Sequence, residues 1–490
     1  MQGKIKKINK MLVGREISAA ELTDKYIDYI QKNDTVLNSY TEKTFDEAKK
    51  TAAEVDRKIA AGEEISVLAG VPMTVKDCIC TKDVSTTCAS KILEGYKPVF
   101  DAFAVEQLKY NDAVMLGKTN MDEFAMGSTC ETSCYGATKN PHNTECVPGG
   151  SSGGVAAAVA ADMAVYGLGS DTGGSVRQPA SFCGCVGLKP TYGAVSRYGL
   201  IAYASSLDQI GILAQNTEDA AIAFDAVNKY DFKDATCSDK PRKSAYEMLG
   251  EDIKGLKIGI LTNLYEGLNP EIHGKINDAI DFYTRMGAEV KEISINQFDL
   301  ALPVYYILAC AEASSNLSRY DGVRYGHRTK EFSDFNDMVC KTRDEGFGVE
   351  VKRRIMLGNY VLSSGYFDAY YKKAQRMREV ISDGFANAFK DVDAIITPTV
   401  ASTAFKLGEM SGDPVAMYLT DMCTVTVNIC GLPAVSIPCG FDSRNMPIGM
   451  QLIGNKFSEG LLLNAAYAFE DAKQNEIYSK PQVGGDCFGI

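Results

Sequence analysis

Two short glycine-rich motifs, each carrying serine, constrain this chain more than any other feature. The first is PGGSSGG at residues 148–154, and the second is GSDTGGS at residues 169–175. Glycine permits sharp turns and lets backbone N–H groups come close to a ligand. A serine at the end of such a turn presents its hydroxyl at a strand-to-helix corner, beside amides that can hold an oxyanion. The pair therefore points to a fold in which strands feed directly into helices.

Short apolar segments alternate with helical segments along most of the chain. Helices are predicted at residues 153–161 and 271–286, and the strands are predicted at residues 71–75, 113–117, 163–169, 255–261, 289–295, 393–398 and 434–438. Such alternation predicts an α/β fold with a mixed, mostly parallel central sheet that is covered by helices on both faces.

Residues 1–65 are predicted to form an N-terminal helical arm. Ser18 and Glu21 have the spacing of a capping box, and a second helix is expected from Phe45 to Ala61, ending at Gly62. Residues 228–242 are polar and are interpreted as a domain linker or a surface excursion. We expect a single domain over residues 1–490.

Charge and hydropathy exclude several classes of protein. The net charge is −12, whereas a chain that grips nucleic acid by itself needs a basic footprint. No membrane span is expected, because no window holds about 18 uninterrupted apolar residues. The N-terminus has no apolar segment of the kind that forms a signal peptide, so a cytoplasmic location is expected.

The fifteen cysteines are interpreted as free thiols in a reduced compartment, because they are scattered through apolar segments. No metal site is expected, since there is no C-x-x-C pair and the three histidines, His142, His273 and His327, are isolated. No nucleotide-binding motif is complete either: the GKT at residues 117–119 lacks the glycine that a phosphate-binding loop needs five positions earlier. No cofactor is therefore expected to bind this chain.

The serines leave two candidate nucleophiles. GGSSG at residues 149–153 fits the G-x-S-x-G elbow, which would make Ser151 the nucleophile and would require a histidine further along. The alternative makes Ser175 the nucleophile and Ser151 a relay to Lys76, which follows an apolar strand. A lysine has a solution pKa of about 10.4, and burial can lower that pKa until the amine acts as a base. In this second reading the amides of Thr172, Gly173 and Gly174 would face a developing oxyanion.

Residues 149–190 resemble the amidase signature family, whose members transfer acyl groups from amides with a Ser–cisSer–Lys triad. The resemblance implies that Lys76 is the base, that Ser151 is the bridging serine with a cis peptide bond, and that Ser175 forms the acyl-enzyme. It also implies that Thr172, Gly173 and Gly174 form the oxyanion loop, and that residues 70–215 form the signature core within the amidase signature fold.

Further segments are similar to one branch of that family, the glutaminase subunits of glutamyl-tRNA(Gln) amidotransferases. These segments are MDEFAMGS at 121–128, PTYGAVSRYGL at 190–200, SSLDQ at 205–209, RYDGVRYG at 319–326 and GNYVLSSGY at 358–366. By this resemblance the glutamine-binding residues are Tyr306, Arg354 and Asp421. Arg354 would pair with the α-carboxylate of glutamine and Asp421 with its α-ammonium.

The resemblance implies partners as well as a substrate. The chain would hydrolyse glutamine within a heterotrimer and pass ammonia to a B subunit, with a C subunit as the third member. The B subunit would hold the tRNA and would activate Glu-tRNA with ATP and magnesium. The alternative function is that of a stand-alone amidase of the same family.

Overall fold

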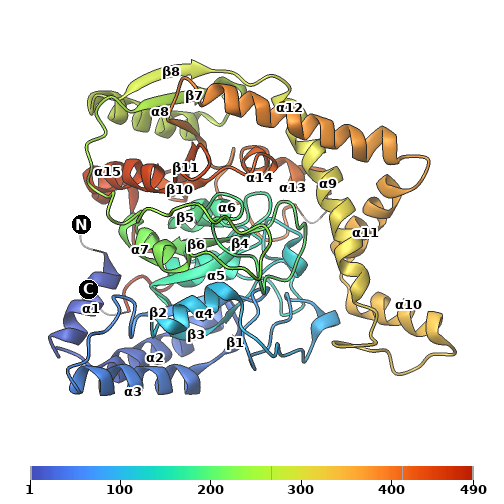
Figure 1. The fold of residues 1–490 in the computed structure, drawn as a ribbon, viewed down its shortest axis with the longest axis horizontal. Coiled ribbons are helices and arrows are strands. Elements are labelled where there is room, and N and C mark those ends of the chain that lie inside the picture. Colours follow the sequence, from blue (N-terminus) through green and yellow to red (C-terminus); the bar gives the residue numbers. More distant parts are fainter. Residues whose placement is uncertain (1–2, 266–267, 411, 488–490) are drawn as a thin grey trace.

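One sheet of eleven strands runs through the computed structural model, which describes residues 3–265, 268–410 and 412–487 (Figure 1). Along the sheet the strands follow the order β1-β3-β2-β4-β6-β5-β10-β11-β9-β7-β8. Their bounds are β1 Tyr40–Lys43, β2 Pro72–Lys76, β3 Val114–Thr119, β4 Tyr166–Asp171, β5 Val186–Lys189, β6 Gln209–Ala214, β7 Lys257–Leu261, β8 Glu289–Ile293, β9 Ala394–Pro398, β10 Ala434–Phe441 and β11 Pro447–Gly454.

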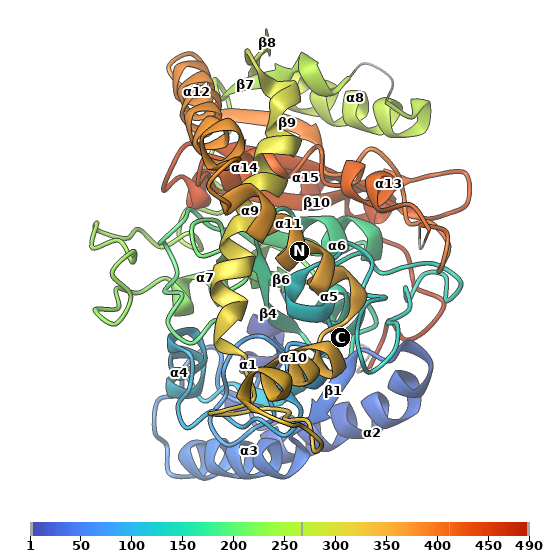
Figure 2. The same ribbon diagram turned by 90° about the vertical axis from the view of Figure 1, so that its right-hand side faces the viewer.

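Helices flank this sheet, and several of them form an extension beyond it. α9, α10 and α11 lie on one side of the molecule in Figure 1 and face the viewer in Figure 2. The helix bounds are α1 Lys4–Val13, α2 Ala19–Leu37, α3 Phe45–Ala60, α4 Phe103–Tyr110, α5 Gly153–Ala160, α6 Arg177–Cys183, α7 Thr217–Val227, α8 Pro270–Arg285, α9 Ala301–Asn316, α10 Phe335–Gly346, α11 Val349–Leu362, α12 Lys373–Ala388, α13 Pro414–Leu419, α14 Val425–Ile429 and α15 Glu459–Ile477. A π-helix, Phe367–Lys372, joins the α11 region to α12.

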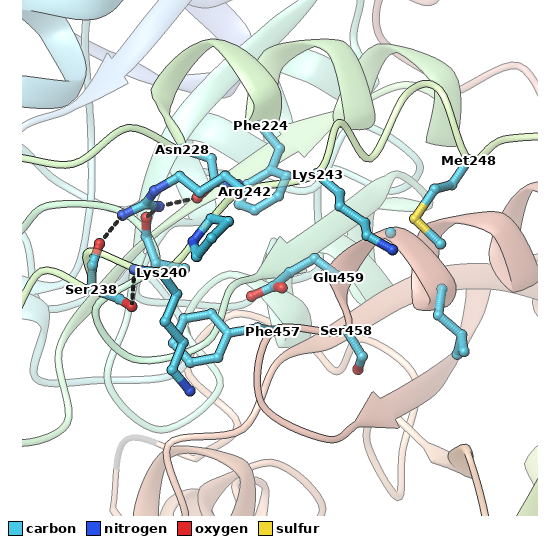
Figure 3. A pocket seen from close by; sticks show the side chains of 14 residues that line it. Phe224, Asn228, Ser238, Lys240, Arg242, Lys243, Met248, Phe457, Ser458 and Glu459 are labelled. Carbon is cyan, nitrogen blue, oxygen red and sulfur yellow. Dashed lines mark hydrogen bonds between the residues drawn. The ribbon is translucent and has the colours of Figure 1, made fainter.

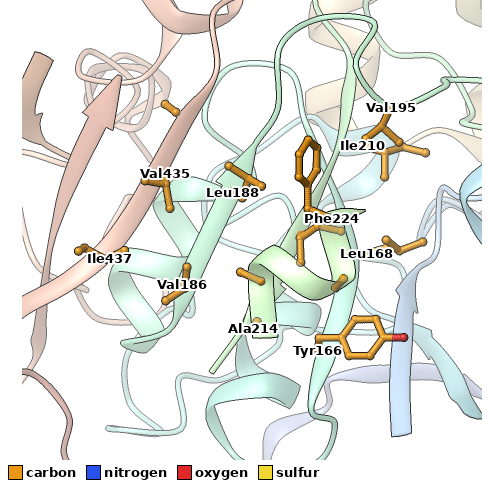
Figure 4. Packing of buried hydrophobic residues seen from close by; sticks show 14 of the residues in the cluster. Tyr166, Leu168, Val186, Leu188, Val195, Ile210, Ala214, Phe224, Val435 and Ile437 are labelled. Carbon is orange, nitrogen blue, oxygen red and sulfur yellow. The ribbon is translucent and has the colours of Figure 1, made fainter. Parts of the chain in front are cut away.

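Strand β6 shows how both faces of the sheet are covered. Leu213 belongs to a buried cluster with residues of α5 and α6, whereas Ile210 and Ile212 belong to a second cluster that includes Phe224 of α7 (Figure 4). Successive side chains of a strand point to opposite faces, so α5 and α6 lie on one face and α7 lies on the other. The predicted α/β class and the coverage of both faces are therefore confirmed.

The expectation of a mostly parallel sheet is wrong. Within the described residues, six of the ten strand pairs are antiparallel and four are parallel. Every antiparallel pair includes one of four strands that the sequence analysis did not predict, namely β1, β5, β6 and β11. The predicted strands pair with one another in parallel, and the strands between them reverse the direction.

The N-terminal arm contains the predicted helices, but it also contains a strand that was not predicted. Ser18 caps α2, because its hydroxyl accepts from the Glu21 amide at 3.0 Å while the Glu21 carboxylate accepts from the Ser18 amide at 3.0 Å. Between α2 and α3, however, residues 40–43 form strand β1 and pair with β3 at the sheet edge. This pairing ties the arm to the sheet.

Residues 228–242 form a surface excursion and not a linker. The segment folds back on the loop after β5: the Ser196 hydroxyl donates to Asp231 at 2.7 Å and the Arg197 amide donates to Asp234 at 2.8 Å. Among the helices that the structure describes, none is long and apolar enough to cross a bilayer.

Truncation of a buried residue on a central strand should measurably lower the free energy of unfolding. Leu188 lies on β5 and is fully buried, so Leu188→Ala should lower the free energy of unfolding by about 2–5 kcal/mol through lost burial and a residual cavity. Chemical denaturation followed by circular dichroism measures the change. Val99→Ala is the control, because Val99 is 82% exposed and should change stability by less than about 0.5 kcal/mol. Equal stability of the two variants would contradict this account of the core.

Candidate active site

Lys76 is the last residue of β2, and its ammonium group is enclosed by serines from the two glycine-rich motifs. Its Nζ lies 2.7 Å from Ser151 Oγ, 2.9 Å from Ser152 Oγ and 2.9 Å from Ser170 Oγ. The side chain is fully buried, and this burial lowers the pKa of Lys76 below its ordinary value of 10.5. A buried amine of lowered pKa beside a hydroxyl is the arrangement that a lysine base requires.

Ser151 follows a cis peptide bond from Gly150, in agreement with the prediction. Its carbonyl accepts from the Asp122 amide at 3.3 Å, and the Asp122 carboxylate fills the space where a side chain at position 150 would lie. None of the contacts described for the three histidines involves Ser151. The geometry therefore favours Ser151 as a partner of Lys76 over a nucleophile served by histidine.

Ser175 lies in the loop that joins β4 to α6, next to the first motif. The Ser152 amide donates to the Ser175 carbonyl at 3.0 Å, which places the two serine loops in direct contact. Among the described residues no hydrogen bond joins the hydroxyls of Ser175 and Ser151. The proton transfer between those two hydroxyls therefore stays a prediction.

A buried ion pair holds the Ser175 loop in place. Arg177 Nη2 lies 2.9 Å from Asp171 Oδ1, and both side chains are completely buried. Burial by itself would raise the pKa of Asp171, but the charge and hydrogen bonds of Arg177 outweigh it and hold that pKa well below its usual range. Arg177 also donates to Gln451 at 2.6 Å and to Asn428 at 2.7 Å. The pair thus ties β4, α6, β11 and α14 together beneath the loop.

The oxyanion loop differs in one residue from the prediction. The Gly174 amide donates to Asp171 Oδ1 at 2.8 Å, so it is occupied inside the loop. Gly174 has φ of +130°, and a side chain there would collide with the hydroxyl of Thr424. Gly174 therefore shapes the loop, while no acceptor is described for the amides of Thr172 and Gly173 within the described part of the chain. Those two amides remain the predicted oxyanion donors.

The three predicted glutamine-binding residues lie together. The Tyr306 hydroxyl donates to Asp421 Oδ2 at 2.7 Å, and the Arg354 guanidinium lies 5.2 Å from the centre of the Tyr306 ring. Ser128 donates to the other Asp421 oxygen at 2.8 Å. Burial raises the pKa of Asp421 to about 6. At neutral pH the cluster therefore presents a buried carboxylate and a buried guanidinium joined by one tyrosine.

Thr424 connects this cluster to the catalytic loop. Its hydroxyl contacts the Gly173 carbonyl at 2.6 Å and the Asp421 carbonyl at 3.0 Å. Gly173 in turn packs against the ring of Tyr305, the neighbour of Tyr306 on α9. The charged cluster and the Ser175 loop are consequently adjacent walls of one site.

Arg354 is anchored from two sides. Its Nε donates to Glu350 at 2.8 Å and its Nη1 donates to the Tyr203 hydroxyl at 2.6 Å. A cavity of about 310 Å³ lies beside the cluster, and Thr129, Val349 and Glu350 are among the residues that line it. Glu350 therefore both anchors Arg354 and lines this cavity.

A different cavity, also of about 310 Å³, lies between the 238–248 segment and the start of α15 (Figure 3). Lys240, Arg242, Lys243 and Glu459 are among its lining residues. It contains none of the residues that the sequence predicts for catalysis or glutamine binding. This cavity is therefore separate from the candidate active site.

Sequence reasoning missed several residues of the site. Asp171 and Arg177 were visible as two charges inside a buried, glycine-rich segment, and that signal could have found them. Ser152 and Ser170 had no such signal, because only the fold brings them to Lys76. Thr424 and Asn428 come from a part of the chain some 250 positions away and carry no local motif.

Comparison with known proteins places the chain. A family model described as Amidase matches residues 21–463. The chain belongs to the amidase family. It is 52% identical over 467 residues to the A subunit of the glutamyl-tRNA(Gln) amidotransferase of Thermosynechococcus vestitus, with 95% of this chain and 97% of that protein covered. The corresponding protein of Agathobacter rectalis is 52% identical over 470 residues, with 95% and 93% covered.

Solved structures of the family have the same fold. The crystal structure of the A subunit of the glutamyl-tRNA(Gln) amidotransferase from Thermotoga maritima has a TM-score of 0.78 and 38% identity, and the match covers 96% of this chain and 95% of that one. The structure of 6-aminohexanoate cyclic dimer hydrolase has a TM-score of 0.84 and 26% identity, with 98% and 99% covered. The predicted resemblance to the amidase signature family is confirmed.

The lowered pKa of Lys76 predicts the pH dependence of amide hydrolysis. Only the neutral amine can accept a proton, so kcat/KM should fall as the pH drops through the pKa of Lys76. Because burial lowers that pKa, the midpoint should lie below 10.5. Initial rates over a pH series measure the profile. A midpoint at or above 10.5 would contradict a buried lysine base.

Removing Arg177 should strongly destabilise the chain. Arg177→Met leaves Asp171 as a buried charge without its partner, at a cost of about 3–5 kcal/mol in the free energy of unfolding. The same substitution at the exposed Arg324 is the control, with an expected change of less than about 0.5 kcal/mol. Chemical denaturation compares the two variants, and equal losses would show that the buried pair does not hold the loop.

Proposed function

We propose that this chain is the glutaminase subunit of a glutamyl-tRNA(Gln) amidotransferase. The observation that carries the proposal is the buried cluster of Arg354, Tyr306 and Asp421 beside the Ser175 loop. The cluster offers one positive and one negative group, which matches the α-carboxylate and α-ammonium of a free amino acid. The identity of 52% to the A subunit of the Thermosynechococcus vestitus enzyme supports the same function.

Recognition of glutamine follows from the charges of the cluster. Arg354 pairs with the α-carboxylate, and its donors are oriented beforehand by Glu350 and Tyr203. Asp421 accepts from the α-ammonium and is mainly ionised at neutral pH, because burial raises its pKa only to about 6. With both groups on the α-carbon held in place, the side-chain carboxamide would extend toward Ser175.

The chemistry then runs through the three predicted catalytic residues. Ser175 Oγ attacks the carboxamide carbon while its proton passes through Ser151 to neutral Lys76. The amides of Thr172 and Gly173 stabilise the oxyanion of the tetrahedral intermediate. Lys76 returns the proton through Ser151 to the leaving nitrogen, so that ammonia departs and a glutamyl ester remains on Ser175. Water then attacks the ester and releases glutamate.

The ammonia serves a second reaction in partner subunits. In this proposal the chain assembles with B and C subunits, and the B subunit binds the tRNA together with ATP and magnesium. The B subunit uses ATP to activate Glu-tRNA(Gln) and amidates it to Gln-tRNA(Gln), which makes the complex a carbon–nitrogen ligase with glutamine as amido donor. Because the product is used in protein biosynthesis, the proposal locates this activity in the cytoplasm. The chain's net charge of −12 fits a protein that leaves tRNA to its partner.

A stand-alone amidase is the second candidate function. The fold is shared with 6-aminohexanoate cyclic dimer hydrolase at a TM-score of 0.84, so the architecture alone does not require partner subunits. The two functions differ in how the rate of ammonia release responds to partners and to Glu-tRNA.

Ammonia release from glutamine tests the proposal. Addition of the B and C subunits with Glu-tRNA should raise the rate, because a glutaminase that supplies a ligase is coupled to the acceptor. Ser175→Ala should abolish the release, and mass spectrometry should find the glutamyl adduct on Ser175 in the wild type. A rate indifferent to the partners would favour the stand-alone amidase, and an adduct on Ser151 would falsify the assignment of the nucleophile.

A further inference from the structure

Helix α11 has two faces of opposite character. One face is buried against α9 and carries Glu350 and Arg354 of the candidate site, and Gly358 allows the helix to approach the Cys310 carbonyl closely. The other face is exposed and apolar: Val349 is 74% exposed and Met356 is 71% exposed. We call the exposed apolar residues of this region the α11 patch: Val349, Met356, Leu357, Tyr360, Tyr366 and Tyr370.

The aromatic part of the α11 patch is already ordered. The rings of Tyr360 and Tyr366 lie 4.2 Å apart, and those of Tyr366 and Tyr370 lie 6.0 Å apart. Ordered aromatic side chains are typical anchors of protein interfaces, because little conformational entropy is lost when they bind. The patch lies on the helical extension that faces the viewer in Figure 2.

The patch has a basic rim on an acidic molecule. Two exposed basic residues beside the patch, Lys373 and Arg376, have no ion-pair partner among the described residues, whereas the whole chain has a net charge of −12. Lys372, Lys373 and Arg376 are exposed. An apolar centre with a basic rim complements a partner surface that has an apolar centre and acidic groups around it.

We propose that the α11 patch is the docking surface for the subunit that consumes the ammonia, and that this subunit presents an apolar and acidic face to it. The inference rests on the proposed function. The cavity beside the candidate site is lined by Val349 of the patch and by Glu350 and Arg353 of the same helix. A protein docked on α11 would therefore lie next to that cavity.

The side chains favour a protein over RNA as the occupant. The centre of the patch is made of valine, methionine, leucine and tyrosine, which bind protein surfaces through buried apolar area. Three of the basic residues are already paired: Lys352 with Asp344, Arg353 with Glu350 and Lys372 with Asp368. Within the described part of the chain, Lys373 and Arg376 are left without an ion-pair partner, and two free basic groups are few for an RNA site, which neutralises several phosphates.

Binding of the full chain to the ammonia-consuming subunit, measured by biolayer interferometry, tests the surface. The double variant Met356→Glu/Tyr360→Glu should bind at least about tenfold more weakly than the wild type, because it places charges at the centre of the interface. The double variant Val99→Glu/Tyr110→Glu is the matched control, since both of its positions are exposed and lie outside the patch. It should bind as the wild type does.

A second variant covers the case in which the first does not fold. Lys373→Glu/Arg376→Glu changes only exposed rim residues. It should weaken binding and reduce the dependence of the affinity on salt, because complementary charges would be lost. Filter binding of tRNA to the chain alone is measured in parallel. Loss of tRNA binding in this variant with unchanged subunit binding would overturn the proposal in favour of RNA.

The outcomes separate this inference from the proposed function. If the wild type binds the subunit and both patch variants bind equally well, the surface is wrong and the function stands. If the wild type fails to bind the subunit, the proposed function fails and the surface fails with it. Weaker binding by the patch variants, with normal binding by the control, supports both.

Discussion

The buried pair of Asp171 and Arg177 is the interaction on which the site depends. Asp171 ends a central strand and Arg177 begins the following helix, so the pair closes the turn that carries Ser175. Two charges without solvent are costly unless each is fully paired. Here Arg177 also reaches Asn428 and Gln451, while Asp171 accepts from the Gly174 amide. The loop conformation is consequently fixed by electrostatics in a region of low dielectric.

Burial has a different consequence for Lys76, because no opposite charge is paired with its amine among the described residues. Asp171 is paired with a full positive charge, whereas the Lys76 amine, within the described part of the chain, donates to three serine hydroxyls and one carbonyl. Neutral partners do not compensate the loss of hydration, so the pKa of the amine is lowered and not raised. Lys76 and Asp171 lie on neighbouring strands, because β2 pairs with β4. One sheet thus holds a permanent ion pair and a titratable base side by side.

The sequence predicted those parts of the site whose signal is local. The glycine motifs located Ser151 and Ser175, and the apolar strand before Lys76 indicated a buried amine. The parallel strands were predicted from short apolar segments that alternate with helical segments. Strands β5, β6 and β11 were missed, although β4 and β7, which were predicted, also contain glycine, so composition alone does not separate the two groups. Thr424, Asn428 and Gln451 could not be predicted, because their contacts with the 171–177 loop depend on how distant segments pack. The family resemblance supplied Tyr306, Arg354 and Asp421, which no local pattern distinguishes.

The contact through Thr424 joins two segments in which different residues can be substituted independently. The groups that cleave the amide come from residues 76–175. The charged cluster itself comes from residues 306–421, and Ser128 and Tyr203 contact it from outside that segment. Substitutions of Tyr306, Arg354 or Asp421 would alter the shape and charge of the accepted amide, whereas other residues hold the reacting hydroxyls in position. Relatives that hydrolyse other amides are therefore expected to diverge most in the helical extension and least in the glycine-rich loops, so that one cleavage chemistry serves many substrates.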